Sequence, residues 1–298
     1  SWEKISGPWE QETDPYGDFS ALLRKSIAID PNNPEIVYVG SNKGFGLYKS
    51  VDGGDSWQEI NNGLPHLSWP ASSKYWLVAA IAIASSNPDI VYVGTTDIKP
   101  YHSWVPHGMG VYKSIDGGSS WTPANGVNGE QFPKYPISSM VVDPTNANTV
   151  YVGTVGGGIW KTPDGGDSWQ HIWSPIGELC FDVNAIAISP ANPAIIYAAV
   201  YNYVPLSGSI PSGIVFQGGL YKSETGGSSW EKVWGERVDD IMIDNKDASI
   251  LYAVICGYRV YKSVDGGTNW DDIGGTSGED PLPNPSYDNP IRIGSVYL

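Results

Sequence analysis

The sequence predicts an all-β protein, specifically a β-propeller, and three observations support this prediction. A ten-residue segment, YKSVDGGDSW at residues 48–57, recurs four more times along the 298-residue chain. The same succession of short β-type runs accompanies each copy. The composition favours strands and turns, with 36 glycines, 23 prolines, 18 tyrosines and 13 tryptophans. Four short strands per repeat, repeated along a chain, are typical of propeller blades.

Each repeat contains four strand-like runs in a fixed order. The first two, such as SIAIDP and IVYVGS, are rich in Val, Ile and Tyr between turn residues, which predicts strands. Their continuous apolar character predicts burial on both faces. The third run resembles GLYKS, and the fourth follows the repeated segment, as in SWQEI. Five complete blades are therefore predicted, at about residues 24–61, 78–125, 137–173, 183–234 and 238–274.

Two further strands are predicted at the ends of the chain. Residues 1–5 copy the fourth strand of a blade, and residues 291–298 have the pattern of a first strand. They predict an incomplete or shared sixth blade within a single propeller domain of residues 1–298. Three explanations stay open. The chain is a fragment of a longer propeller, a terminal patch closes a five-bladed ring, or the open strand edge pairs with another subunit.

The repeated segment resembles the Asp-box (BNR) motif, S-x-D-x-G-x-[ST]-W, of sialidases, xyloglucan hydrolases, sortilin-type ectodomains and photosystem assembly factors. Thr162, Thr225 and Asn269 depart from the motif in the later copies. An Asp in a tight turn accepts backbone hydrogen bonds, Gly supplies φ > 0, and the Trp is expected to pack across the turn onto its own blade.

The resemblance implies that the motif lies on the turn between the third and fourth strands, away from the ligand face. Its residues are therefore expected to be structural, although five equivalent ligand or Ca²⁺ sites are an alternative. The residues concerned are Asp52, Trp57, Asp116, Trp121, Asp164, Trp169, Trp230, Asp265 and Trp270.

The connections expected on the opposite face are long and rich in aromatic residues. Long irregular loops tend to carry function, and aromatic rings can stack on sugars or grip an extended peptide. The alternative is that these rings form a small core for the loops themselves. The candidate ligand-binding residues are Trp69, Tyr75, Trp76, Tyr101, Trp104, Tyr135, Tyr201 and Tyr203.

Acidic residues on the same face are candidates for catalysis, because glycoside hydrolysis needs two carboxyl groups. With 32 acidic residues in the chain, any particular pair is weakly indicated. The catalytic candidates are Asp97, Glu130, Glu178 and Asp182, with Asp239 and Asp240 nearby.

Metal-binding and disulfide signals are few. His66, His102 and His107 fall in two of the long loops, but their spacing indicates no metal site, and no metal or cofactor is expected. Cys180 and Cys256 are predicted to lie on the long-loop face of adjacent blades. They could form a disulfide that acts as a structural staple.

The enzymes that share the motif guide the expected activity. Sialidases are similar to one another in binding the substrate carboxylate with three arginines. This chain has four arginines in all, and it lacks the Arg-Ile-Pro motif of those enzymes. Segments such as AIDPNNPEIVYVGS and GLYKSVDGGDSW resemble the blades of xyloglucan hydrolases more closely. That resemblance implies two propellers, each supplying one catalytic acid, and a single propeller would lack the second.

The charge and the termini limit the partners. A net charge of −15 repels nucleic acid and anionic membrane surfaces, and no stretch is apolar enough to insert into a membrane. The first ten residues lack the features of a signal peptide. An exported protein is thus expected in its mature form, outside the cell or on its surface.

Three functions follow from these observations, in order of preference. The first is a non-enzymatic propeller that binds polysaccharide or glycoprotein through its aromatic loop face. The second is a glycoside hydrolase of the xyloglucanase type that needs a partner domain. The third is a structural or assembly subunit that joins copies of itself or a partner through an open blade edge.

Overall fold

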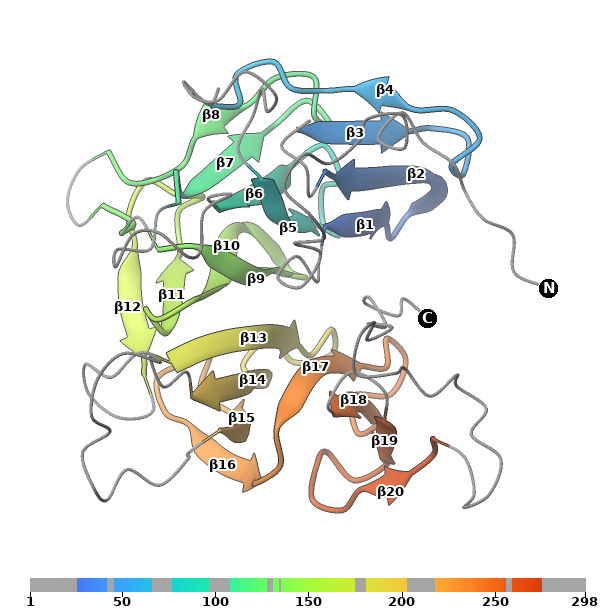
Figure 1. Ribbon diagram of the computed structural model, residues 1–298, viewed down its shortest axis with the longest axis vertical. Coiled ribbons are helices and arrows are strands. Elements are labelled where there is room, and N and C mark those ends of the chain that lie inside the picture. Colours follow the sequence, from blue (N-terminus) through green and yellow to red (C-terminus); the bar gives the residue numbers. More distant parts are fainter. Residues whose placement is uncertain are drawn as a thin grey trace, which may run out of the picture. The chain divides into compact units, whose positions relative to one another are not determined.

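The computed structural model describes residues 26–41, 46–65, 77–96, 108–127, 131–133, 135–174, 181–202, 218–255 and 259–274. Within these ranges all regular elements are β-strands, which form five four-stranded sheets (Figure 1). Each sheet is one propeller blade, and its strands lie side by side in chain order. The predicted all-β fold with five four-stranded blades is confirmed. Both predicted terminal strands lie outside the described residues.

The blades follow one another along the chain. Blade 1 contains β1 (Ile27–Asp30), β2 (Asn33–Gly40), β3 (Leu47–Ser50) and β4 (Gln58–Glu59). Blade 2 contains β5 (Leu77–Ile83), β6 (Val91–Thr96), β7 (Val111–Ser114) and β8 (Thr122–Pro123). Blade 3 contains β9 (Ile137–Asp143), β10 (Asn146–Thr154), β11 (Ile159–Thr162) and β12 (Gln170–Trp173).

The last two blades have the same organisation. Blade 4 contains β13 (Phe181–Ile188), β14 (Ile196–Asn202), β15 (Gly219–Ser223) and β16 (Glu231–Trp234). Blade 5 contains β17 (Val238–Ile243), β18 (Leu251–Ile255), β19 (Arg259–Ser263) and β20 (Asp271–Asp272). Two compact units result: the first includes blades 1 and 2, the second includes blades 4 and 5, and blade 3 contributes residues to both.

Burial decreases from the first strands of a blade to the last. In blade 2, residues 77–82 of β5 and 91–95 of β6 are all buried, as their unbroken apolar runs predict. The fourth strands β4, β8 and β20 are two residues long, and both residues of each strand are exposed. The core of each blade therefore lies on its first three strands.

The turn between the third and fourth strands, which we call the repeat turn, is held by its own side chains. In the first copy, Ser50 Oγ donates to Asp52 Oδ1 over 2.7 Å and accepts the Gly54 N–H over 2.8 Å. The carboxylate of Asp52 also accepts the backbone N–H and the hydroxyl of Ser56. Gly53 and Gly54 adopt φ of 71° and 104°, which favours glycine at both positions.

These hydrogen bonds stabilise the ionised carboxylate. They lower the pKa of Asp52 to about 2, chiefly through the Ser56 hydroxyl, and that of Asp116 to about 2, chiefly through the Ser120 hydroxyl. In the fourth copy Thr225 stands where Asp is expected. Its Oγ1 still accepts the Ser229 N–H over 2.9 Å, so a hydroxyl replaces the carboxylate in the same turn.

Four of the repeat tryptophans contact the preceding blade, which the prediction of packing onto their own blade missed. The indole N–H groups of Trp121 and Trp169 donate to Ile60 O and Ala124 O of the blade before, each over 2.8 Å. Trp230 and Trp270 donate to their own turns, at Gly227 O and Gly267 O. They nevertheless also stack on aromatic rings of the preceding blade: Trp230 on Trp173 and Trp270 on Trp234.

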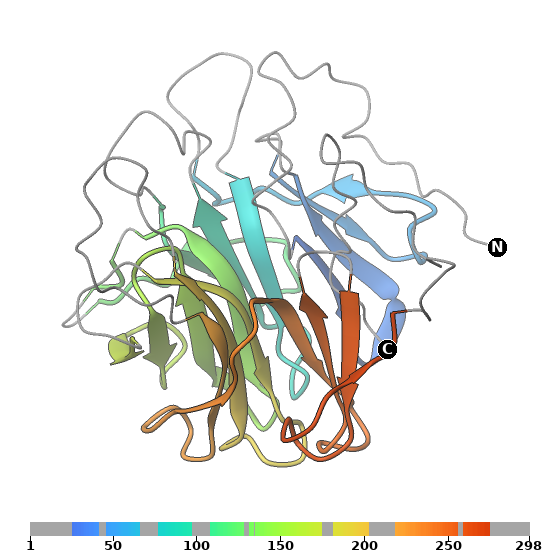
Figure 2. The ribbon, with the colours of Figure 1, turned by 60° about the horizontal axis from the view of Figure 1, so that its bottom comes forward.

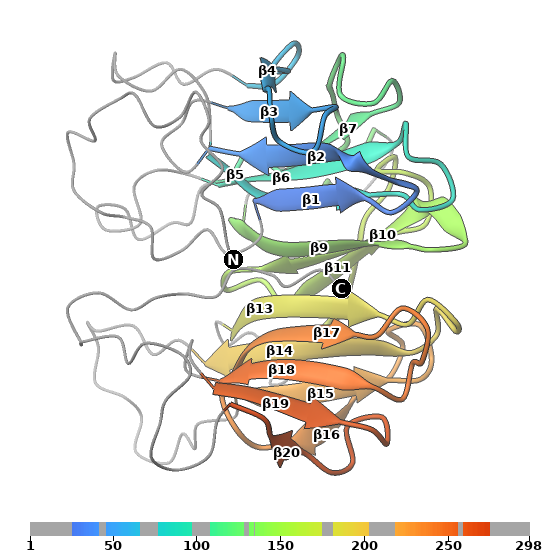
Figure 3. The same ribbon diagram turned by 90° about the vertical axis from the view of Figure 1, so that its right-hand side faces the viewer.

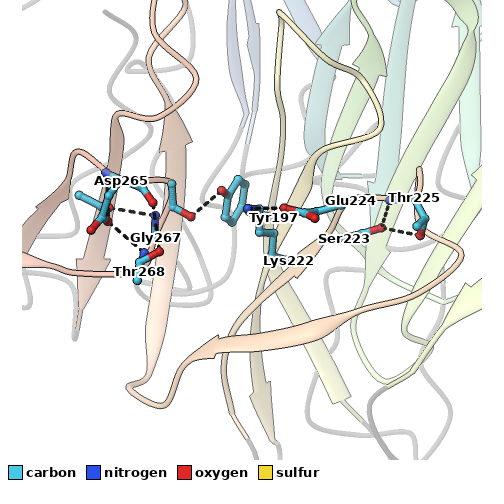
Figure 4. Close-up of polar contacts among 10 residues, drawn as sticks. Tyr197, Lys222, Ser223, Glu224, Thr225, Asp265, Gly267 and Thr268 are labelled. Carbon is cyan, nitrogen blue, oxygen red and sulfur yellow. Dashed lines mark hydrogen bonds and ion pairs between the residues drawn. The ribbon is translucent and has the colours of Figure 1, made fainter.

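A tyrosine of the second strand makes a further link between blades. Tyr38 donates its hydroxyl to Gly117 O over 3.0 Å, and Tyr197 donates to Gly266 O over 2.8 Å. Both carbonyls belong to the repeat turn of the following blade. Figure 4 shows Tyr197 beside the repeat turn of blade 5. A lysine of the third strand covers each ring, with Lys49 Nζ 5.2 Å from the ring centre of Tyr38. The repeat turn thus accepts a hydrogen bond from a tyrosine of the preceding blade.

Replacement of Trp169 by Ala tests this packing. Trp169 is 1% exposed and meets Phe132 at a ring distance of 4.9 Å, so we expect W169A to lower the free energy of unfolding by about 3–5 kcal/mol. The matched variant W230A removes a half-buried ring and should cost distinctly less. Chemical denaturation monitored by circular dichroism measures both, and equal losses would contradict the account.

Candidate active site

Asp182, one of the catalytic candidates, lies among the described residues. It is located at the end of blade 4 where β13 begins and β14 ends. We call the strand ends on this side the loop edge, because the connections that follow second and fourth strands leave from it. Figure 3 shows β13 and β14 beside β17, the first strand of blade 5. Asn184 joins the two blades there by donating its Nδ2 to Val238 O over 3.4 Å.

Asp182 is partly buried near the start of β13. Its backbone forms an isolated antiparallel bridge with Val155, and the next residue, Val183, is fully buried. Burial raises the pKa of the Asp182 carboxyl to about 7, although a hydrogen bond from the Gly156 N–H partly opposes the rise. A carboxyl that keeps its proton near neutral pH is suited to general acid catalysis.

An aromatic ring and a second carboxylate lie at the same edge. Tyr201 is paired directly with Asp182 across β13 and β14, so the two side chains share one face of the sheet. The guanidinium of Arg237 lies 4.4 Å from the ring centre of Tyr201. The Nε of Arg237 donates to Asp239 Oδ1 over 3.1 Å, and Asp239 is 5% exposed.

This part of the molecule therefore places three carboxyl groups in different surroundings. Burial raises the pKa of Asp182 to about 7, whereas Asp239 is held in an ion pair with Arg237. Asp240, also at the start of β17, accepts the N–H of Ile241 over 2.9 Å. Such an environment can give one carboxyl the role of acid and another the role of base or nucleophile.

Most other predicted site residues lie outside the described residues. Among the aromatic candidates, Tyr135 and Tyr201 are described, and the Tyr135 N–H donates to Pro133 O over 2.8 Å. The predicted residues outside the described ranges are Trp69, Tyr75, Trp76, Tyr101, Trp104, Tyr203, Asp97, Glu130, Glu178, Cys180 and Cys256. Their assignments as ligand-binding, catalytic or disulfide residues stay predictions.

Arg237 is a residue of this edge that the sequence does not single out. The structure pairs it with Asp239 and places it over Tyr201, thirty-six positions earlier in the chain. The short segment RVDD offers a local signal for the ion pair, because Arg237 and Asp239 are two residues apart. The contact with Tyr201 has no local signal, since it depends on β14 lying beside β17.

In the described part of the chain, no three His, Cys, Asp or Glu side chains gather as a metal site would require. No helix among the described residues has the length and apolar character needed to cross a membrane.

Comparison with known sequences finds similarity to xyloglucanases. The chain is 24% identical to a xyloglucanase of a Paenibacillus species over 259 residues, which is 78% of this chain and 24% of that protein. It is 25% identical to the xyloglucanase Xgh74A of Acetivibrio thermocellus over 262 residues, or 27% of that protein. The chain thus spans about a quarter of the length of these relatives. No protein-family profile matches it.

Solved structures show the same fold. An ancestral GH74 enzyme superposes with a TM-score of 0.60 and 22% identity over 83% of this chain and 32% of its own. The GH74 xyloglucanase of Xanthomonas campestris gives a TM-score of 0.59 and 19% identity, over 82% of this chain and 37% of its own. The resemblance of the blades to xyloglucan hydrolases is confirmed at the level of the fold.

The raised pKa of Asp182 predicts a pH dependence of stability. Between about pH 4 and pH 7 the folded protein holds a proton that the unfolded chain releases, so the free energy of unfolding falls as the pH rises through this range. One proton contributes a slope of at most about 1.4 kcal/mol per pH unit. D182N should remove this contribution, whereas D143N, at the exposed turn between β9 and β10, should keep it.

Denaturant titrations at several pH values measure the three proteins. Parallel pH profiles for the wild type and D182N would show that Asp182 titrates near its ordinary value in the folded state.

Proposed function

We propose that this chain is a propeller of an extracellular glycoside hydrolase that acts on xyloglucan or a related β-glucan. Asp182 is the general acid in this proposal. The observation that carries it is the half-buried carboxyl whose pKa is raised to about 7, in a fold shared with xyloglucanases. The similarity to xyloglucanases supports this function more directly than non-enzymatic binding, which the sequence alone favoured.

The chemistry requires a second carboxyl. Asp182 would donate its proton to the glycosidic oxygen as the bond to the anomeric carbon breaks. A carboxylate ~5–9.5 Å away would attack that carbon or activate a water for the attack. Asp239 and Asp240 are candidates in blade 5, and Asp97 is a candidate outside the described residues. The length of the relatives allows the alternative that the second carboxyl comes from a further part of a longer protein.

The polysaccharide-binding part of the proposal includes the aromatic loop residues predicted from the sequence. Neutral glucans suit a protein with a net charge of −15, because their binding involves no charge repulsion. The structural or assembly role through an open blade edge has no supporting observation in the described residues, and it stays the third alternative.

Hydrolysis of xyloglucan by the D182N variant tests the proposal. We expect D182N to lower the rate of reducing-end release by about 10²–10⁴-fold, because the acid is lost while the shape of the side chain is kept. D143N should hydrolyse at the wild-type rate. The wild-type rate should fall above about pH 7, where Asp182 loses its proton.

Migration through gels cast with xyloglucan separates this function from simple binding. Retardation of the wild type without any release of reducing ends would favour the binding propeller. Release that D182N leaves unchanged would assign the acid to another residue.

A further inference from the structure

A cavity beside the last strand of blade 4 is a candidate for a second ligand site. Its volume is about 610 Å³, and it lies among residues of blade 5 and the segment that joins the two blades. Figure 2 shows the strands of blade 5 in orange and red. The lining residues used below are Trp234, Glu236, Arg259, Tyr261, Asn269 and Trp270.

The aromatic residues of this cavity form a rigid platform. The rings of Trp234 and Trp270 stack with centres 4.6 Å apart and planes only 7° from parallel. Tyr261 meets Trp234 edge-on at 5.1 Å. The indole N–H of Trp270 is bound to Gly267 O over 3.0 Å, which fixes the orientation of the ring. Flat, half-buried indoles are suited to stack on the C–H face of a pyranose.

Polar groups surround the platform. Glu236 can accept hydrogen bonds from hydroxyls, and Arg259 can donate them. Arg259 lies 3.6 Å from Asp272 and within hydrogen-bonding distance of the Tyr261 hydroxyl, so its charge is balanced locally. Asn269 donates its Nδ2 to Asp265 over 2.7 Å, which leaves its amide oxygen as the acceptor of that side chain. This set suits a neutral ligand with many hydroxyl groups.

Blade 5 departs from the other blades at these positions. The residue before the third-strand Leu, Val or Ile is glycine in the other four blades: Gly46, Gly110, Gly158 and Gly219. In blade 5 it is Arg259. The glycines at 46 and 110 have positive φ, and a Cβ there would collide with an Asn side chain. Asn269 likewise replaces the Ser of the other copies. Both substitutions bring polar groups to the cavity.

The corresponding junctions from blade 1 to blade 2 and from blade 2 to blade 3 are filled. Ile60 and Leu64, which follow β4, belong to the buried cluster that contains Trp121 of blade 2. Phe132, in the connection after β8, packs against Trp169 of blade 3. The connection between β16 and β17 contains only residues 235–237, which include no apolar side chain that could fill the space. The cavity is thus open where these two junctions hold a hydrophobic side chain.

We propose that this cavity binds a neutral pyranose unit of a β-linked polysaccharide, as a site separate from the carboxyl groups at the loop edge. The polysaccharide class rests on the proposed function, but binding at the cavity does not require hydrolysis. In this role the indole pair stacks on the sugar ring, while Glu236, Arg259 and Asn269 bind its hydroxyls. The site would hold the chain of a polymer near the catalytic end of the molecule.

Nuclear magnetic resonance with a xyloglucan oligosaccharide tests the inference. The titration uses ¹⁵N-labelled D182N protein, so that the oligosaccharide is not cleaved. Amide signals of residues 259–261 and 268–270 are expected to shift together and to give one dissociation constant. The substitutions R259A and N269S, made together, should raise this constant by about tenfold or more. N269S restores the residue of the other copies and so leaves the repeat turn intact.

S229A is the matched control, because Ser229 occupies the position of Asn269 in blade 4, outside the lining of the cavity. It should leave the constant unchanged. Absence of shifts at residues 259–261 and 268–270, or an R259A/N269S protein that binds as tightly as its parent, would overturn the inference. Hydrolysis by the wild type is measured separately, so failure of the catalytic proposal is recognised independently of this result.

Discussion

The hydrogen bond from a second-strand tyrosine to the repeat turn of the next blade is the contact on which the rest of the structure depends. Tyr38 and Tyr197 are almost fully buried, and their hydroxyls bind Gly117 O and Gly266 O. A rigid turn loses less conformational entropy when its carbonyl accepts this bond. Ser50, Asp52 and their counterparts provide that rigidity. The ten-residue segment therefore forms the last turn of its own blade and also accepts a hydrogen bond from the blade before it. This double role explains why it is repeated.

Because the repeat turns make these contacts between blades, the residues of the loop edge can serve other chemistry. A half-buried carboxyl such as Asp182 is unfavourable for folding once it is ionised, because few groups replace its lost hydration. The repeated contacts between blades can offset that cost elsewhere in the molecule. Blade 5 shows the same principle on a smaller scale. It keeps the Tyr197–Gly266 link while Arg259 and Asn269 change the lining of a cavity next to it.

The fold could be predicted because the repeat fixes both the order of strands and the residues of each turn. The contacts between blades could not be predicted, because they join residues that are distant in the sequence. Trp121, for example, binds Ile60, sixty-one positions away. Asp182 was recognisable as one acidic residue among many, but its raised pKa depends on burial beside Val155 and Gly156, which sequence does not reveal. The cavity left a readable signal, because RVYKS differs from GLYKS in its first residue, but only the structure shows that Arg259 and Asn269 share one space.

The protonation of Asp182 is the most direct test of the account. Its carboxyl ¹³C chemical shift, followed by nuclear magnetic resonance between pH 3 and pH 9 and assigned with D182N, reports this one group. The account predicts a midpoint near pH 7. A midpoint near pH 4, the ordinary value for aspartic acid, would show an ionised carboxylate at neutral pH and would contradict its assignment as the acid.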